Sequence, residues 1–180
     1  AKACFQRTGG PVGYAAKCAA ESGTCAFTGT RTVAFGEAGG YIYRTFTGGT
    51  AVPHDTTPPL ITEGHALLSL GFTPKAATNL LDVSCKVQIG KTAAGYYSVS
   101  LFDGNTLLAA TYGYAAANSD QETVSFEEPL YAAGSTTPRT FSVRVGQPTT
   151  SETIMVGGGS TVTFGGAAIH STLTVREIVA

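Results

Sequence analysis

Short apolar segments with a period of two recur along the last two thirds of the chain, and turn residues separate them. We expect strands near residues 64–72, 80–89, 95–102, 106–114, 122–128, 139–146, 153–156, 160–164 and 171–178. Side chains alternate between the two faces of a strand, so this period indicates strands with one buried face. Many short strands separated by turns are typical of sandwiches and barrels. The sequence therefore predicts an all-β chain, folded as a jelly-roll-like antiparallel β-sandwich.

Leu81, Val83, Cys85, Val87 and Ile89 share one face of a single predicted strand. Clean alternation is also seen over residues 141–145 and 172–176. The segment 103–105, Asp-Gly-Asn, is the strongest hairpin turn in the chain. No segment has a sustained helical period.

Pro53, Pro58 and Pro59 interrupt any strand pairing and predict a linker over residues 53–60. We thus divide the chain into a small cysteine-containing β-module at 1–52, the linker, and the sandwich at 61–180. Residues 24–36 and 40–48 of the module read as two strands, and we expect them to pair as a hairpin. About fifty residues bury little core alone, so the module should depend for its stability on the second region, a disulfide or a neighbouring subunit.

The charge balance disfavours two classes of partner. The chain has 11 Lys and Arg against 12 Asp and Glu, a net charge of −1, and only 13% charged residues. A balanced charge gives no long-range field to gather nucleic acid or an anionic membrane, and no apolar run approaches the ~20 residues that span a bilayer. We expect neither partner. Low charge suits β-surfaces that pack against copies of themselves.

The four cysteines allow two disulfides. Our first choice is Cys18–Cys25, because the Ser-Gly turn signal between them could bring the sulfurs within bonding range. We interpret Cys85 as a buried core thiol rather than the partner of Cys4, although Cys4–Cys85 is the alternative second pair. The spacings of 14, 7 and 60 residues between successive cysteines do not fit a zinc site. We predict no metal and no cofactor.

The histidines and glutamates do not form a recognisable catalytic pattern. His54, His65 and His170 are far apart in sequence, and we interpret them as separate surface or edge residues. Glu127 and Glu128 are adjacent in a predicted strand, so they should point to opposite faces. With Glu122 they fit a solvated, charged sheet edge better than the paired carboxylates of a glycosidase. We predict no catalytic residue and no enzyme.

The densest group of aromatic and basic residues is Tyr41, Tyr43, Arg31 and Arg44. The two tyrosines share a face of their strand and could stack on a sugar or a protein partner. The other interpretation is that the rings seal the small module against its neighbour. These four residues are our candidate ligand-binding set.

The sequence resembles a C-terminal β-domain of bacteriophage virion proteins over residues 55–180. The segments that carry the resemblance are 55–65 and 70–82 at its start, 99–104 and 131–135 within it, and 164–178 at its end. The resemblance implies a jelly-roll-like fold, threefold assemblies on tails, fibres or heads, and no enzymatic site.

Residues 23–36 resemble a cysteine-containing β-module of secreted glycan-active proteins and of some phage proteins. The shared pattern is Gly-Thr-Cys-x-Phe-x-Gly-Thr-Arg-x-Val-x-Phe-Gly. That module has a further cysteine after its Thr-Gly-Gly-Thr turn, where this chain has Ala51, Val52 and Pro53.

These observations predict a virion structural protein of a bacteriophage, a surface decoration, cap or fibre-tip protein that acts through protein–protein contacts. We expect a homotrimer at the virion surface, in contact with neighbouring capsid or tail proteins. Host-surface glycan is a further candidate partner. The alternative is a secreted, extracellular carbohydrate-binding module that grips sugar through Tyr41 and Tyr43.

Overall fold

The computed structural model describes residues 3–7, 14–18, 27–34, 44–117, 120–157 and 171–179, with side chains from residue 45 onward. The described residues form thirteen strands and no helix, which confirms the predicted all-β class. No helix in this part of the chain could therefore cross a membrane. Strands β1 (Ala3–Arg7) and β2 (Tyr14–Cys18) pair antiparallel as a two-stranded sheet of their own.

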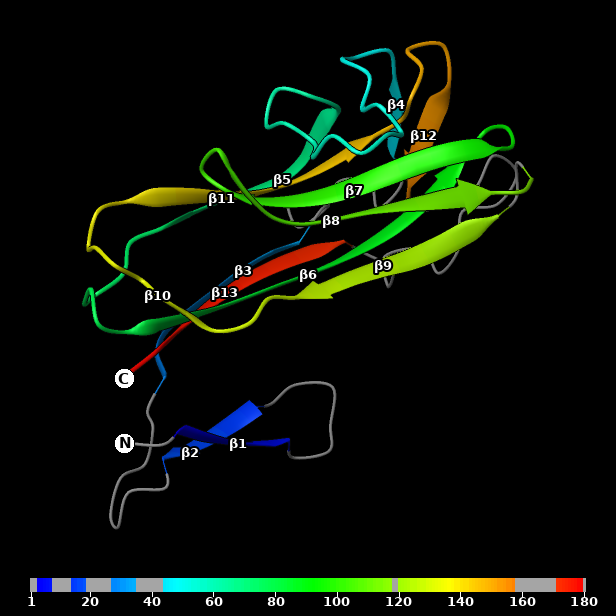
Figure 1. Cartoon of the computed structure of the whole chain (residues 1–180). Helices are drawn as coiled ribbons and strands as arrows, with labels where there is room; N and C mark the ends of the chain where they lie inside the picture. The colour runs from blue at the N-terminus through cyan, green and yellow to red at the C-terminus, as the bar shows by residue number, and fades with distance from the viewer. Residues whose placement is uncertain are drawn as a thin grey trace.

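The larger sheet is built around β6, the longest strand (Figure 1). β13 pairs with residues 80–86 of β6 and β12 with residues 89–91. β9 pairs with residues 84–90, so it must lie on the other edge of β6, where β10 also pairs. Strand β3 then pairs with β13, and β4 with β12. The strands are β3 (Phe27–Ala34), β4 (Arg44–Thr47), β6 (Leu80–Lys91), β9 (Gln121–Glu127), β10 (Tyr131–Ala132), β12 (Thr153–Val156) and β13 (Thr172–Ile178).

The second sheet has the order β5-β11-β7-β8, with every neighbouring pair antiparallel. Its strands are β5 (His65–Phe72), β7 (Gly95–Asp103), β8 (Thr106–Ala115) and β11 (Arg139–Gly146). Figure 1 shows this sheet as a layer above β6, β9 and β13. Two antiparallel sheets packed face to face make the sandwich that the sequence predicts.

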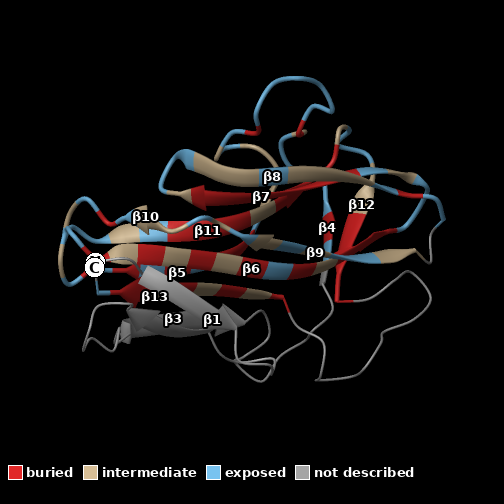
Figure 2. Cartoon of the chain, turned by 60° about the horizontal axis from the view of Figure 1, so that its bottom comes forward, coloured by how far each residue is buried: buried red, intermediate tan, exposed pale blue. Residues whose placement is uncertain are grey.

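The core lies between the two layers, where Figure 2 shows buried residues alternating along β6 with less buried ones. The predicted face of β6 is confirmed, because all five of its alternating residues from Leu81 to Ile89 are at most 4% exposed. From the other strands come Val99, Leu101, Phe141, Val143, Val145, Ile154, Val156, Leu173 and Val175, each at most 1% exposed.

The strands predicted after residue 60 agree with the structure to within two residues, except that 160–164 lies outside the described residues and the two-residue β10 was not predicted. The 103–105 turn joins β7 to β8 as expected, with Gly104 at a φ of +57°. A bulge shifts the pairing of β7 with β8 between Leu101 and Phe102. An extra residue of this kind turns the side chains beyond it to the other face.

The predicted hairpin of residues 24–36 with 40–48 is wrong. β3 pairs with β13, and β4 pairs with β12, so both strands belong to the larger sheet. The physical reason is that β6 pairs with only one edge of β12 and of β13, and β4 and β3 satisfy the backbone N–H and C=O groups of the other edge. The division of the chain at 53–60 stays a prediction, but the sheet crosses it.

The sandwich has two lateral sides that differ. On the closed side, β5 packs against β3 and β13 of the opposite sheet. On the open side lie β8, at the edge of one sheet, and β9 with β10, at the edge of the other. Among the described residues, β8 pairs with β7 alone, and β9 and β10 pair with β6 alone.

Candidate functional site

The structure describes only part of the ligand-binding set predicted from the sequence. Arg31 lies in β3, opposite Val175, and Arg44 begins β4, opposite Val156. Tyr41 and Tyr43 lie outside the described residues. Because β3 and β4 are not paired with each other, the expected hairpin does not bring the two arginines together. Ligand binding by these residues stays a prediction.

Cys85 is a free, buried thiol in β6, and burial raises its pKa to about 12. It packs as the small core hydrophobe that we preferred, and the structure forms no bridge from it to Cys4 in β1. Cys18 ends β2, whereas Cys25 lies outside the described residues. The Cys18–Cys25 pairing is thus not tested.

The open side carries the half-buried hydrophobic residues that pack against the core. These are Leu108 and Ala109 of β8, Val124 and Phe126 of β9, and Tyr131 of β10. On the closed side, by contrast, Leu67, Leu68, Leu70 and Phe72 of β5 are at most 8% exposed. The chain therefore covers its core fully on one side and partly on the other.

Tyr97 and Glu122 bridge the two sheets at one end of the open side. The Tyr97 hydroxyl donates a hydrogen bond to the Glu122 carboxylate across the gap between β7 and β9. Burial, and then this bond, raise the pKa of Tyr97 well above its ordinary value. The ring crosses Gly113, where a Cβ atom would lie 2.1 Å from the Tyr97 hydroxyl. Glu122 is thus an exposed residue of the edge strand β9, as predicted, and in addition it bridges the two sheets.

Tyr131 makes the matching bridge at the other end of the open side. Its hydroxyl donates to Asp103 at 3.2 Å, and Arg139 donates to the same carboxylate oxygen at 2.9 Å. Burial, followed by the charge of Asp103, raises the pKa of Tyr131. The open side thus has a polar bridge at each end and apolar side chains between them.

A second exposed feature lies on the outer face of the β7–β8 hairpin. We call His54, Tyr96, Tyr112 and Tyr114 the aromatic cluster. His54 stacks on Tyr96 with ring centroids 4.0 Å apart and packs edge-on against Tyr112 at 4.9 Å. Tyr96 meets Tyr114, its cross-strand partner, edge-on at 4.9 Å. Tyr96 is 43% exposed and Tyr114 50% exposed.

A buried ion pair fixes the backbone beneath this cluster. The Lys91 side chain is fully buried, and its ammonium donates to the Tyr96 carbonyl at 2.9 Å and to the Glu152 carboxylate. Glu152 keeps 31% of its side chain exposed. Because an unpaired buried charge is costly, Lys91 holds Tyr96 and Glu152 in one place.

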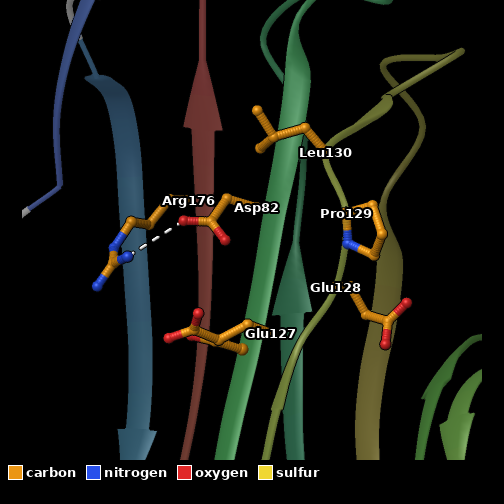
Figure 3. A pocket seen from close by; sticks show the side chains of 7 residues that line it. Asp82, Glu127, Glu128, Pro129, Leu130 and Arg176 are labelled. Carbon is orange, nitrogen blue, oxygen red and sulfur yellow. Dashed lines mark hydrogen bonds and ion pairs between the residues drawn. The ribbon is translucent and has the colours of Figure 1, made fainter. Parts of the chain in front are cut away.

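A pocket of about 290 Å³ opens on the outer face of the larger sheet, at β6, β9 and β13 (Figure 3). It is lined by Asp82, Ser84, Glu127, Glu128, Pro129, Leu130 and Arg176. Figure 3 shows the 3.1 Å ion pair between Arg176 and Asp82, with the carboxylates of Glu127 and Glu128 pointing to different sides.

Both glutamates line this one pocket, but their carboxylates point to different sides, as strand alternation predicts (Figure 3). β9 ends at Glu127, and the Glu128 backbone N–H still donates to the Val83 carbonyl at 2.9 Å. Burial raises the pKa of Glu128. With more carboxylates than cations around it, the pocket suits a cationic group better than an anionic one.

The histidines are separate where they are described. His54 belongs to the aromatic cluster, while a ring nitrogen of His65 lies 2.8 Å from the Gly48 carbonyl oxygen. His170 lies outside the described residues. Within the described ranges, no three His, Cys, Asp or Glu side chains are grouped so that they could hold a metal ion.

Sequence reasoning missed the aromatic cluster and both polar bridges. Tyr112 and Tyr114 share a strand face at a spacing of two, and this signal could have drawn attention to them. Pairing across the 103–105 turn without a bulge would place Tyr96 opposite Gly113. The bulge shifts the register by one residue and brings Tyr96 opposite Tyr114.

No protein-family model matches the sequence, and no curated protein matches it. Among solved structures, a chain from infectious bursal disease virus, Gx strain, has 12% identity and a TM-score of 0.44, covering 97% of this chain and 41% of that one. A chain from T=1 particles derived from infectious bursal virus has 16% identity and a TM-score of 0.37, covering 97% and 44%.

A chain of dimeric latent PorU from Porphyromonas gingivalis has 10% identity and a TM-score of 0.39, covering 76% of this chain and 12% of that one. The present chain thus spans about two fifths of the length of the viral chains it matches. All these TM-scores are below 0.5, which is too low to carry an argument about function.

Proposed function

We propose that this chain is a virion structural protein of a bacteriophage, which assembles as a homotrimer through its open side. The observation that carries the proposal is the row of half-buried hydrophobic residues in β8, β9 and β10, which in the described part of the chain pack against the edge of the core. Apolar surface left between two unpaired sheet edges is surface that an assembled neighbour would cover.

The residue composition of the edge strands β8 and β9 favours an assembly of copies over a monomer. β8 is ten residues long and has neither a charged residue nor a proline. Solvent-facing edge strands in monomers are generally blocked by such residues. β9 instead carries Glu122 and Glu127, so an uncharged edge lies beside an acidic one.

The resemblance of residues 55–180 to virion β-domains supplies the biological setting of the proposal. Decoration, cap or fibre-tip positions all require contacts between copies and with neighbouring capsid or tail proteins, and none requires catalysis. The proposed location is the virion surface. The aromatic cluster favours a second candidate, a secreted carbohydrate-binding module, because exposed tyrosine rings suit sugars.

Native mass spectrometry of the purified chain tests the proposal. We expect a trimer, with three times the 18.4 kDa mass of one chain. Val124→Lys places a charge on the half-buried row and should give monomers. Thr123→Lys, at the exposed neighbouring residue of the same strand, should leave the trimer intact.

Ala110→Lys adds a charge at an exposed residue of β8, where the fold itself should tolerate it. We expect this variant to weaken the trimer as well. A wild-type chain that stays monomeric at micromolar concentrations would overturn the proposal.

A further inference from the structure

We propose that Tyr96 and Tyr114 form a binding site for a neutral sugar ring of a glycan. The site lies on the outer face of the β7–β8 hairpin, whereas the half-buried row of the open side packs against the core. It consists of residues other than the candidate set predicted from the sequence. If the chain is a virion protein, this site would provide its contact with host-surface glycan.

The first argument is the exposure of the rings. Tyr96 and Tyr114 are among the few large apolar side chains exposed in the described part of the chain, at 43% and 50%. Their planes meet at 63° with centroids 4.9 Å apart, so the pair presents two ring surfaces at an angle. Tyrosine combines an apolar body with a polar tip, as the C–H faces and hydroxyl groups of a sugar require.

The second argument is that the rings are held in place before any ligand arrives. His54 stacks on Tyr96 at an interplanar angle of 22°, and the Tyr112 hydroxyl donates to the Pro53 carbonyl at 2.7 Å. Lys91 holds the Tyr96 carbonyl from below. A preorganised aromatic surface loses little conformational entropy on binding.

The third argument concerns charge and selects the class of sugar. The carboxylates of Asp55 and Glu63 act on Tyr112 closely enough to contribute, after burial, to its raised pKa. The nearby Glu152 carboxylate is paired with the Lys91 ammonium, so this ion pair adds no net positive charge that would attract an acidic sugar. Carboxylates accept hydrogen bonds from sugar hydroxyls but repel sialic or uronic acids. The site therefore fits neutral rather than acidic glycans.

The fourth argument is size. Two half-exposed rings match one or two sugar rings, whereas a stable protein interface buries about 800 Å² on each partner. We therefore assign the cluster to a glycan and the longer open side to protein contacts.

A glycan array carrying neutral oligosaccharides, such as maltohexaose and galactose- and mannose-based chains, beside sialylated and uronic-acid glycans tests the proposal. We expect the wild-type chain to bind neutral glycans in preference to acidic ones. Tyr114→Ala and Tyr96→Ala should each weaken binding about tenfold or more, as measured by titration with the best array ligand. Tyr114→Phe should retain most of the binding, because it keeps the ring.

The matched control is Leu60→Ala, which removes another exposed apolar side chain, 56% exposed, outside the aromatic cluster. It should bind as the wild type does. Circular dichroism confirms that each variant is folded, and Tyr114→Ala is the safest variant because half of its side chain is in solvent.

Three results would overturn the proposal: no binding to any neutral glycan, a preference for acidic glycans, or full binding by folded Tyr114→Ala. These outcomes are separate from the oligomeric state. A trimer that binds no glycan refutes the sugar site alone, and a monomer that binds glycan through Tyr114 refutes the virion proposal alone.

Discussion

The two lateral sides of the sandwich both carry apolar side chains, but those side chains are buried to different extents. On the closed side, Leu68 and Leu70 of β5 are at most 5% exposed, because β3 and β13 pack over them. On the open side, Leu108 and Phe126 are half-buried between two edges that two tyrosine–carboxylate bridges connect. A hydrophobic strand residue thus indicates that it faces the core, but not how completely the rest of the chain buries it.

The largest effect that separates the sides is the loss of a leucine. We expect Leu70→Ala to lower the free energy of unfolding by about 3 kcal/mol, because the surrounding core cannot fill the cavity. Leu108→Ala should cost only about 1 kcal/mol, since part of that side chain is already in water. Urea unfolding below the concentration at which copies associate measures both, and equal costs would contradict the comparison.

Two glycine-to-alanine substitutions test the bridge between Tyr97 and Glu122 on the open side. Gly113→Ala would drive a Cβ atom into Tyr97 and break its bond to Glu122, for a loss of about 2 kcal/mol. Gly71→Ala in β5 is the control, because a Cβ atom there meets nothing within 4 Å. Its effect should stay within about 0.5 kcal/mol. A tolerated Gly113→Ala, by thermal and urea unfolding, would show that the bridge does not hold the edges.

The fold was predictable where local pattern decides it. The alternation of β6 and the Asp-Gly-Asn turn specify strands and a hairpin from neighbouring residues alone, and both are confirmed. The partners of β3 and β4 were not predictable, because β12 and β13 follow more than a hundred residues later. Long-range pairing depends on which faces remain uncovered in the whole fold, and a local pattern does not record that.

The candidate sites likewise combine features that a local sequence pattern predicts with features that depend on long-range contacts. The alternation of Val124 and Phe126 is visible in sequence, but their half-burial depends on the position of β9 at the edge of the described sheet. The aromatic cluster needs the bulge at residues 101–102 and a loop residue, His54, far away along the chain. Neither leaves a signal in the spacing of the tyrosines.

Alkaline titration tests whether the core beside the open side is dry. Cys85 lies opposite Phe126, and burial raises its pKa from 9.0 to about 12. Above pH 9 the unfolded thiol loses its proton while the folded thiol keeps it. The stabilisation is therefore complete below pH 9 and is lost as the pH rises toward 12, at roughly 1.4 kcal/mol per pH unit.

Urea unfolding at pH 8 to 11 measures this slope, and Cys85→Ala should remove its share. Tyr97 and Tyr131, whose pKa values are also raised, add to the loss above pH 10. If the wild type and Cys85→Ala lose stability in parallel from pH 9 upward, the thiol is not shielded from water.

The smallest expected effect comes from the second bridge. Tyr131→Phe removes the hydroxyl that donates to Asp103 and should cost about 1 kcal/mol, while Arg139 keeps the carboxylate paired. Tyr114→Phe is the control, because that ring is half in solvent, and its cost should be close to zero. Thermal unfolding that ranks the two variants in the reverse order would argue against the Tyr131 bridge.

Hydrogen–deuterium exchange at rising protein concentration tests the central claim, that the open side is an interface between copies, most directly. We predict that backbone amides of β8 and β9 become protected as copies associate, while those of β5 on the closed side do not change. Unchanged exchange in β8 and β9 under conditions where the chain is oligomeric would place the interface elsewhere and contradict the account.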